Sequence, residues 1–365
     1  MNVAYVYPWD VAGDPSAAAR IADLGVEAVA LAASYHSTRA ATPYHPSHRV
    51  LDALHSAFYL PVRPAAWGRL VPGSPTWTPA DSYLIARDAL KEQGLQVQAW
   101  TVLTHNAHLG TKFPDLVVRN AFGDPYPYAL CPAHPDVQDY CANLVRETLD
   151  LGAPDALILE ACGPMGFGHQ GTHEKTAGAD WSAVDGDLLT LCFCTACADR
   201  YPPGTRDRVR EAVGSGFGSV EEALGELTAE VREVRVSLSA DLREKLIAAA
   251  PGVPVTLHAN PDPWAASSFA ALPEGEPGAE VLVGNCWGEV EPDCARLSRL
   301  AELATPGQRV GAYVLALPPR AADAKELAAM MRAYREAGAD ELHLYHAGLA
   351  SPQRLAAMAE ALRHL

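Results

Sequence analysis

Residues 135–160 read PDVQDYCANLVRETLDLGAPDALILE, and this stretch contains the pattern that decides the fold. Pro135 opens a helical pattern that runs to Leu151, in the first turn where proline is tolerated. Gly152 follows as a helix stop signal, and residues 156–160 then form a short run of apolar residues. That run does not alternate with polar residues, which is typical of a strand covered on both faces. The stretch therefore predicts a helix followed by a buried parallel strand.

The same unit recurs along the whole chain. Helices are expected at 15–24, 79–93, 135–151, 219–249, 293–304, 322–337 and 351–365. Strands are expected at 2–7, 28–33, 97–103, 156–160, 253–258, 280–283, 310–315 and 341–345. Eight strands alternating with helices predict the α/β class and one (β/α)8 TIM-barrel domain over residues 1–365. A doubly wound open sheet is the alternative, but residues 7–13, YPWDVAG, lack the glycine-rich phosphate loop it needs.

The chain is longer than a minimal barrel. It has 365 residues, whereas eight β/α units need about 250. The surplus lies in segments 34–78, 104–134 and 161–218, which follow the second, third and fourth strands and lack obvious regular structure. Loops after barrel strands form the active-site face, so these long loops are expected to be functional.

Charge and hydropathy exclude several classes of partner. The chain has 28 basic and 44 acidic residues, a net charge of −16, and no basic stripe, which argues against nucleic acid and anionic membrane surfaces. No apolar run reaches the roughly 20 residues that span a bilayer. The first residues show no secretory signal, so we expect a cytoplasmic protein. The oligomeric state stays open, and a homo-oligomer is compatible with the sequence.

Three cysteines lie within six residues: Cys192, Cys194 and Cys197. Such a run can place three thiolates around one Zn²⁺ ion, with a fourth ligand from elsewhere. The candidates for that ligand are Cys131, Cys141, Cys162, His169 and His173. The alternatives are buried thiols without a metal and a redox pair at Cys194 and Cys197, which would need a thioredoxin-like context.

With the Cys-Pro pair at Cys131 and Pro132, this cysteine run resembles glycoside hydrolase family 42, the β-galactosidases, and related glycosidase-like barrels. The resemblance covers residues 97–201. It implies a structural Zn²⁺ held by Cys131, Cys192, Cys194 and Cys197. It also implies that Glu160, at the end of the fourth strand, is the general acid/base.

Glu160 is a catalytic candidate on its position as well, because strand-end residues at the loop face of a barrel carry catalysis. A rim carboxylate paired with an arginine is the alternative. A general acid of this kind needs a raised pKa. The family places Asn before this Glu, where this chain has Leu159, and a nucleophilic carboxylate after the seventh strand, where residues 311–318 contain no acid. Glu289 is the first choice for the second carboxylate, before Asp262 and Asp10; a solvated loop charge is an equal alternative for Glu289.

Aromatic and polar residues recur at six strand ends. Aromatic faces stack on sugar rings, while His, Asn and Asp bond to hydroxyl groups, which predicts a small glycoside or oligosaccharide as substrate. The candidates are Trp9, Asp10, Tyr35, His36, His105, Asn106, His258, Asn260, Asn285, Trp287, Tyr345 and His346. A metal-dependent sugar isomerase or epimerase and a non-catalytic sugar-binding barrel remain as alternatives to a glycoside hydrolase.

Overall fold

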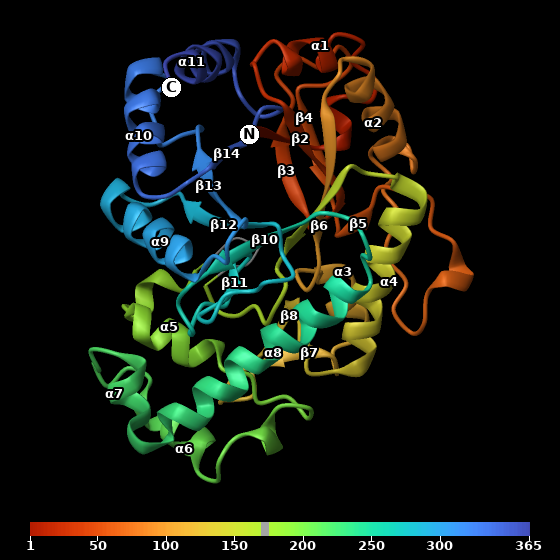
Figure 1. Ribbon diagram of the computed structural model, residues 1–365. Coiled ribbons are helices and arrows are strands. Elements are labelled where there is room, and N and C mark those ends of the chain that lie inside the picture. Colours follow the sequence, from red (N-terminus) through yellow and green to blue (C-terminus); the bar gives the residue numbers. More distant parts are fainter. Residues whose placement is uncertain (169–174) are drawn as a thin grey trace.

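The structure is a computed structural model, and it describes residues 1–168 and 175–365. Its centre is a closed barrel of eight parallel strands (Figure 1). In barrel order the strands are β1 (Asn2–Val6), β2 (Ala28–Tyr35), β6 (Gln96–Val102), β9 (Ala156–Glu160), β10 (Val255–Asn260), β12 (Val281–Cys286), β13 (Arg309–Leu315) and β14 (Glu341–Tyr345). β14 pairs with β1 and closes the barrel. The predicted (β/α)8 fold is confirmed, with shifted ends in the fifth and sixth strands.

Helices surround the barrel and cover its strands on the outside (Figure 1). They include α1 (Ala17–Ala22), α2 (Ser82–Glu92), α4 (Pro135–Gly152), α8 (Thr228–Ala248), α9 (Val290–Leu303), α10 (Ala324–Glu336) and α11 (Pro352–Arg363). The prediction of a single helix at 219–249 was wrong. It is split into α7 (Val220–Leu224), a 3-10 turn (Gly225–Leu227) and α8, because Gly225 has a positive φ of 59° that ends the first helix.

The three long segments contain more regular structure than the sequence predicted. The first holds a hairpin of β3 (Thr38–Ala41) and β4 (Val50–Ala53), and a short strand β5 (Ala57–Phe58) that pairs with β2. The second holds α3 (Ala107–Lys112) and a hairpin of β7 (Val117–Arg119) and β8 (Pro125–Leu130). The third holds α5 (Ala183–Thr190) and α6 (Thr205–Ala212). A two-residue strand β11 (Ala270–Ala271) also lies beside β10. Short pairings of this kind carry too weak a sequence pattern to be recognised.

The interior of the barrel is unusually polar and aromatic. Branched aliphatic residues dominate most barrel interiors. Here the buried residues include Tyr5, Trp100, His258, His343 and Glu341. Space for this set is made by Gly311 on β13, since a Cβ there would lie 3.0 Å from Nε2 of His343.

Among the described residues, none of the helices combines the length and apolar character that crossing a bilayer requires.

Candidate functional site

Glu160 lies at the carboxyl-terminal end of β9 and points into the barrel. It is 5% exposed, and its Oε2 accepts a hydrogen bond of 2.6 Å from Nε1 of Trp100 on the neighbouring strand β6. Nδ1 of His258, on the other neighbouring strand β10, lies 3.3 Å from the same oxygen. Two adjacent strands therefore hold this carboxylate between an indole N–H and an imidazole.

The pKa of Glu160 is lowered. Burial raises it, but the contact with His258, the nearby His36 and the Trp100 hydrogen bond together outweigh that effect. The position of Glu160 in the sequence predicted a general acid with a raised pKa. The surroundings instead favour the ionised carboxylate, which is the state of a base or nucleophile.

Asp10 lies at the same end of the barrel in a different environment. It closes a 3-10 turn (Pro8–Asp10) after β1, and its Oδ2 accepts a hydrogen bond of 2.8 Å from the Tyr7 backbone N–H. Burial raises the pKa of Asp10 to about 7, against the lowering effects of that bond and of Arg20. Gly348 permits this burial, since a Cβ there would lie 1.9 Å from Oδ2 of Asp10. Asp10 therefore can hold a proton near neutral pH.

Aromatic rings line this end of the barrel in unbroken contact. Centroid distances are 4.2 Å for His105–His36, 4.1 Å for His36–Tyr35, 4.8 Å for Tyr35–Tyr7 and 4.2 Å for Tyr7–His346. The contacts continue at 5.1 Å for His346–Tyr345, 4.7 Å for Tyr345–Trp287, 5.5 Å for Trp287–Tyr313 and 4.8 Å for Tyr313–His258. We call these residues the aromatic rim. Trp287 is 39% exposed, so the rim extends from the buried carboxylate to the surface.

Several polar atoms at the rim have no hydrogen-bond partner among the described residues. They are Nε1 of Trp9, Oδ1 of Asp10, Oδ1 of Asn285, and both ring nitrogens of His346. Buried polar atoms are nearly always satisfied, by protein, water or ligand. Trp9 stacks on Tyr7 at 4.4 Å, which places its indole in the same region. These atoms are suited to hydrogen-bond a hydroxyl-rich ligand.

The other predicted site residues are less central. Asn106 is buried and engaged twice, since it caps α3 through Leu109 N–H and donates to the Tyr140 hydroxyl. Asn260 accepts from the backbone N–H of Asp262 and is partly exposed. Glu289 precedes α9 and is exposed, and within the described part of the chain it makes no contact with Glu160. No hydrogen bond or ion pair joins Glu289 to Glu160 among the described residues, and the role of Glu289 stays a prediction.

The residues that control the Glu160 carboxylate were not predicted from the sequence. Trp100 contacts Glu160 directly, and Tyr7 carries both the Asp10 hydrogen bond and the contacts to His346. Tyr5, Tyr313 and Phe269 pack around His258. Apart from Phe269, which lies in the loop between β10 and β11, these residues look like ordinary buried strand residues. Only their alternation toward one face of a strand could have indicated an inward position.

The four cysteines lie together in the long segments that follow β6 and β9. Their sulfur atoms are all within 4.8 Å of one another and buried. Sγ of Cys131, at the end of the β7–β8 hairpin, lies 3.5 Å from Cys197, 3.7 Å from Cys194 and 3.8 Å from Cys192. These separations match the edges of about 3.8 Å in a tetrahedron with Zn–S distances of 2.3 Å. The other candidates for the fourth ligand differ: Cys141 and Cys162 are buried elsewhere, and His169 and His173 lie outside the described residues.

The surroundings of this cluster also fit a metal with thiolate ligands. Sγ of Cys192 accepts backbone N–H bonds from Arg119 and Cys194, at 3.4 and 3.5 Å. The buried guanidinium of Arg235 lies near enough to Cys192 and Cys197 to interact electrostatically with them. A metal with four thiolates has a net negative charge, which a buried arginine offsets. The four cysteines could therefore bind a metal ion.

Comparisons with known proteins support the fold. No family model and no curated protein matches the chain. Among solved structures, it is similar to the PgaB (BpsB) glycoside hydrolase domain from Bordetella bronchiseptica, with 17% identity, a TM-score of 0.60, and coverage of 99% of this chain and 97% of that one. It is also similar to the catalytic domain of β-amylase from Paenibacillus polymyxa, with 14% identity and a TM-score of 0.52. That match covers 97% of this chain and 94% of the β-amylase domain.

A β-galactosidase from the psychrophilic Marinomonas ef1 gives 11% identity, a TM-score of 0.54, and coverage of 100% of this chain but 59% of the galactosidase. At these identities the likeness shows a shared barrel fold. The predicted resemblance to glycosidase-like barrels is supported at that level, and family 42 in particular is not singled out.

Proposed function

We propose that the chain is a glycoside hydrolase whose site is the aromatic rim, with Asp10 and Glu160 as its two carboxylates. The observation that carries this proposal is the opposite effect of the surroundings on the two groups. The pKa of Glu160 is lowered, and that of Asp10 is raised to about 7. Glycoside hydrolysis needs one protonated and one ionised carboxyl group, and such pairs reveal their roles by pKa values driven apart.

The proposed roles differ from those expected from the sequence. Asp10 would donate a proton to the departing glycosidic oxygen, and Glu160 would act as the ionised base or nucleophile. Both carboxylates raise the pKa of Tyr345, so both act on the same part of the rim. Glu289 is replaced by Asp10 as our candidate for the second carboxylate.

The substrate class is inferred from the rim. Aromatic faces and unpartnered polar atoms alternate around the two carboxylates, as a sugar with its apolar ring face and polar hydroxyl groups requires. The three similar structures reported above are a glycoside hydrolase domain, a β-amylase and a β-galactosidase by name, which supports the same class. We propose a small glycoside or oligosaccharide.

Replacement of Glu160 by Gln tests this function. We expect Glu160→Gln to lower turnover of an active glycoside by about 10³-fold, because the amide can be neither base nor nucleophile. Glu302→Gln on the outer face of α9 is the matched control and should retain activity and the same thermal stability. Full activity in Glu160→Gln, or sugar binding without turnover by the native protein across a broad glycoside panel, would contradict the proposal.

The isomerase alternative receives less support. Such enzymes gather carboxylate and histidine ligands around a catalytic metal. In the described part of the chain, the four cysteines are the one group of at least three His, Cys, Asp or Glu side chains arranged closely enough to bind a metal. The aromatic rim has no such group there.

We further propose that the cysteine cluster holds one structural Zn²⁺. The ion would join the hairpin that ends at Cys131 to the loop that begins at Cys192, which connects two of the long segments. Elemental analysis should give about one zinc per chain, and Cys131→Ser should lose it with a lower melting temperature. Cys141→Ser is the control. Equal zinc content in both variants would contradict the site.

A further inference from the structure

Arg235 is a buried cation that has no carboxylate in ion-pair contact. It lies on α8 and is 1% exposed. Its Nη1 donates one long hydrogen bond, of 3.5 Å, to the carbonyl oxygen of Thr190, while Nε and Nη2 have no hydrogen-bond partner among the described residues. No ion pair in that part of the chain includes Arg235. A guanidinium keeps its charge at neutral pH, and a buried charge is costly unless an anion lies nearby. The folded protein therefore needs a counter-charge at this place.

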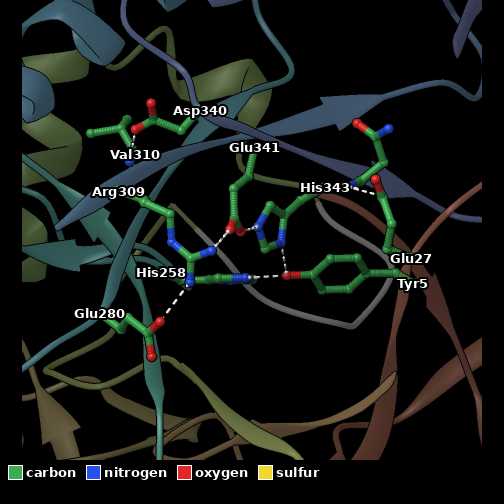
Figure 2. A network of polar contacts seen from close by, with 10 residues as sticks. Tyr5, Glu27, His258, Glu280, Arg309, Val310, Asp340, Glu341 and His343 are labelled. Carbon is green, nitrogen blue, oxygen red and sulfur yellow. Dashed lines mark hydrogen bonds and ion pairs between the residues drawn. The ribbon is translucent and has the colours of Figure 1, made fainter. Parts of the chain in front are cut away.

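Two other arginines show how this protein usually pairs a guanidinium group. Arg309, at the start of β13, contacts two glutamate carboxylates at 2.8 Å each, although it is partly exposed (Figure 2). Arg243, which also lies on α8, is 5% exposed and has the carboxylate of Glu276 at 3.6 Å. Arg235 is buried more deeply than either of them and lacks such a partner. Its counter-charge must therefore be of a different kind.

The acidic groups near enough to act on Arg235 are few: Tyr201, Asp187, Cys192 and Cys197. Tyr201 supplies no charge, because burial raises the pKa of its phenol well above the ordinary value. Asp187 lies beyond ion-pair contact with Arg235, and it is shared with other carboxylates. Burial and the nearby Asp262 raise the pKa of Asp187 to about 6, against the effect of Arg235. The two cysteines are then the remaining source of negative charge.

The cysteine cluster can carry different charges. Protonated thiols and disulfides are neutral, and a single thiolate carries one negative charge. Four thiolates around a divalent metal ion carry a net double negative charge, so the attraction to a neighbouring cation is strongest in that state. Thr190, which accepts the Arg235 hydrogen bond, stands just before the loop with Cys192, Cys194 and Cys197. The guanidinium therefore lies beside the part of the chain that supplies three of the four sulfur atoms.

We propose that Arg235 is the counter-charge of a metal centre formed by the four cysteines, and that it raises the affinity of this centre for a divalent metal ion. The proposal rests on the structural Zn²⁺ proposed above, and it assigns a role to a residue that is not a ligand. Arg235 acts through the thiolates rather than through a bond to the metal. Loss of the metal would leave less negative charge beside a guanidinium that keeps its own charge, so Arg235 opposes that loss.

The metal affinity of Arg235→Met tests this role, because methionine keeps much of the buried volume and removes the charge. We expect its affinity for Zn²⁺, measured by competition with a chelator of known affinity, to be about 10- to 100-fold lower than that of the native protein. Arg232→Met, at an exposed position on the same helix, is the matched control and should bind as the native protein does. Arg235→Gln replaces the methionine variant if that one does not fold. Zinc affinity equal to that of the native protein would overturn the proposal.

Thermal melting separates a role in charge from a role in packing. The melting temperatures of native protein and Arg235→Met are measured with excess Zn²⁺ and after its removal by a chelator under reducing conditions. A metal that binds the folded state raises the melting temperature. We expect that rise to be smaller in Arg235→Met, because the metal-bound cluster loses its counter-charge. A side chain that only fills space would lower both melting temperatures equally and leave the rise unchanged, and that result would overturn the proposal.

The proposals can fail separately. If the native protein takes up no Zn²⁺, the metal site falls and the role of Arg235 falls with it. If the native protein and Arg235→Met bind Zn²⁺ equally well, the metal site holds and only the role of Arg235 falls. Neither result depends on hydrolysis of a glycoside, so the proposed catalytic function is decided by its own experiment.

Discussion

Asp10 and Glu160 stand at the same end of one barrel, and their surroundings have opposite effects on their acidity. Both side chains are buried, and burial raises the pKa of both. Glu160 also faces His258 and Trp100 on the two adjacent strands, and these contacts reverse the effect of burial. Asp10 has a single backbone donor and a more remote arginine, so burial prevails. Partner side chains, rather than depth in the barrel, therefore set the ionisation of each group.

After the loss expected for Glu160→Gln, replacement of Asp10 should give the largest effect on this pair. If Asp10 is the proton donor, kcat/KM of the native enzyme should fall above about pH 7, as the carboxyl loses its proton. We expect Asp10→Asn to lower kcat/KM by about 10²-fold and to remove that alkaline decline. A pH profile of both proteins is the measurement. An unchanged alkaline limb in Asp10→Asn would show that another group donates the proton.

The partner of Glu160 is the next target. His258→Gln removes the contact that does most to lower the pKa of Glu160, so burial should then raise it. We expect a loss of about 10-fold in kcat/KM at pH 5 and a smaller loss at pH 7, because the acidic limb moves to higher pH. His364→Gln, on an exposed histidine near the end of α11, is the control. An equal loss at both pH values would contradict this explanation.

A side chain added beside the Asp10 carboxyl group should have a smaller effect on catalysis. Gly348→Ala would bring a Cβ to within 1.9 Å of Oδ2 of Asp10, so the carboxyl group must move. We expect a loss of about 10-fold in kcat with the alkaline limb displaced from pH 7, while Gly68→Ala, where no atom of the described residues lies within 4 Å of the added Cβ, should be neutral. Kinetics of the two variants side by side decide whether the position of Asp10 matters.

The smallest effect is on stability. The pKa of Asp10 is higher in the folded chain than in the unfolded one, so its protonation stabilises the fold below about pH 4. That contribution is lost as the pH rises through about 7. The melting temperature of native protein should therefore fall between pH 5 and pH 8 by a few degrees more than that of Asp10→Asn. Equal pH dependence in the two proteins would show that the buried carboxyl is not strained by ionisation.

Much of the fold and part of the site could be predicted from the sequence. The alternation of helices and apolar strands predicted the barrel, because burial on both faces leaves a direct local signature. The expectation that Glu160 ends the fourth strand and faces the mouth followed from the same pattern. The helix break at Gly225 and the short hairpins in the long segments were missed, since neither depends on a long periodic pattern.

The polar contacts inside the barrel could not have been predicted, because the residues that make them are far apart in the chain. Tyr5 and His343 are separated by 338 positions, and they meet because β1 and β14 are neighbours in the closed barrel. In the sequence each looks like an ordinary residue of a buried strand. The pKa directions of Asp10 and Glu160 were equally hidden, since they depend on distances of a few ångströms to residues on other strands.

The sequence by itself determined the (β/α)8 barrel, the strand-end position of Glu160, and a cysteine spacing suited to a metal, since each follows from order along the chain. The tertiary structure decided which carboxylate is acidic, which fourth cysteine joins the cluster, and which interior side chains touch. The physical reason is that local periodicity specifies elements and faces. Ionisation and coordination depend instead on contacts that exist only once the barrel has closed.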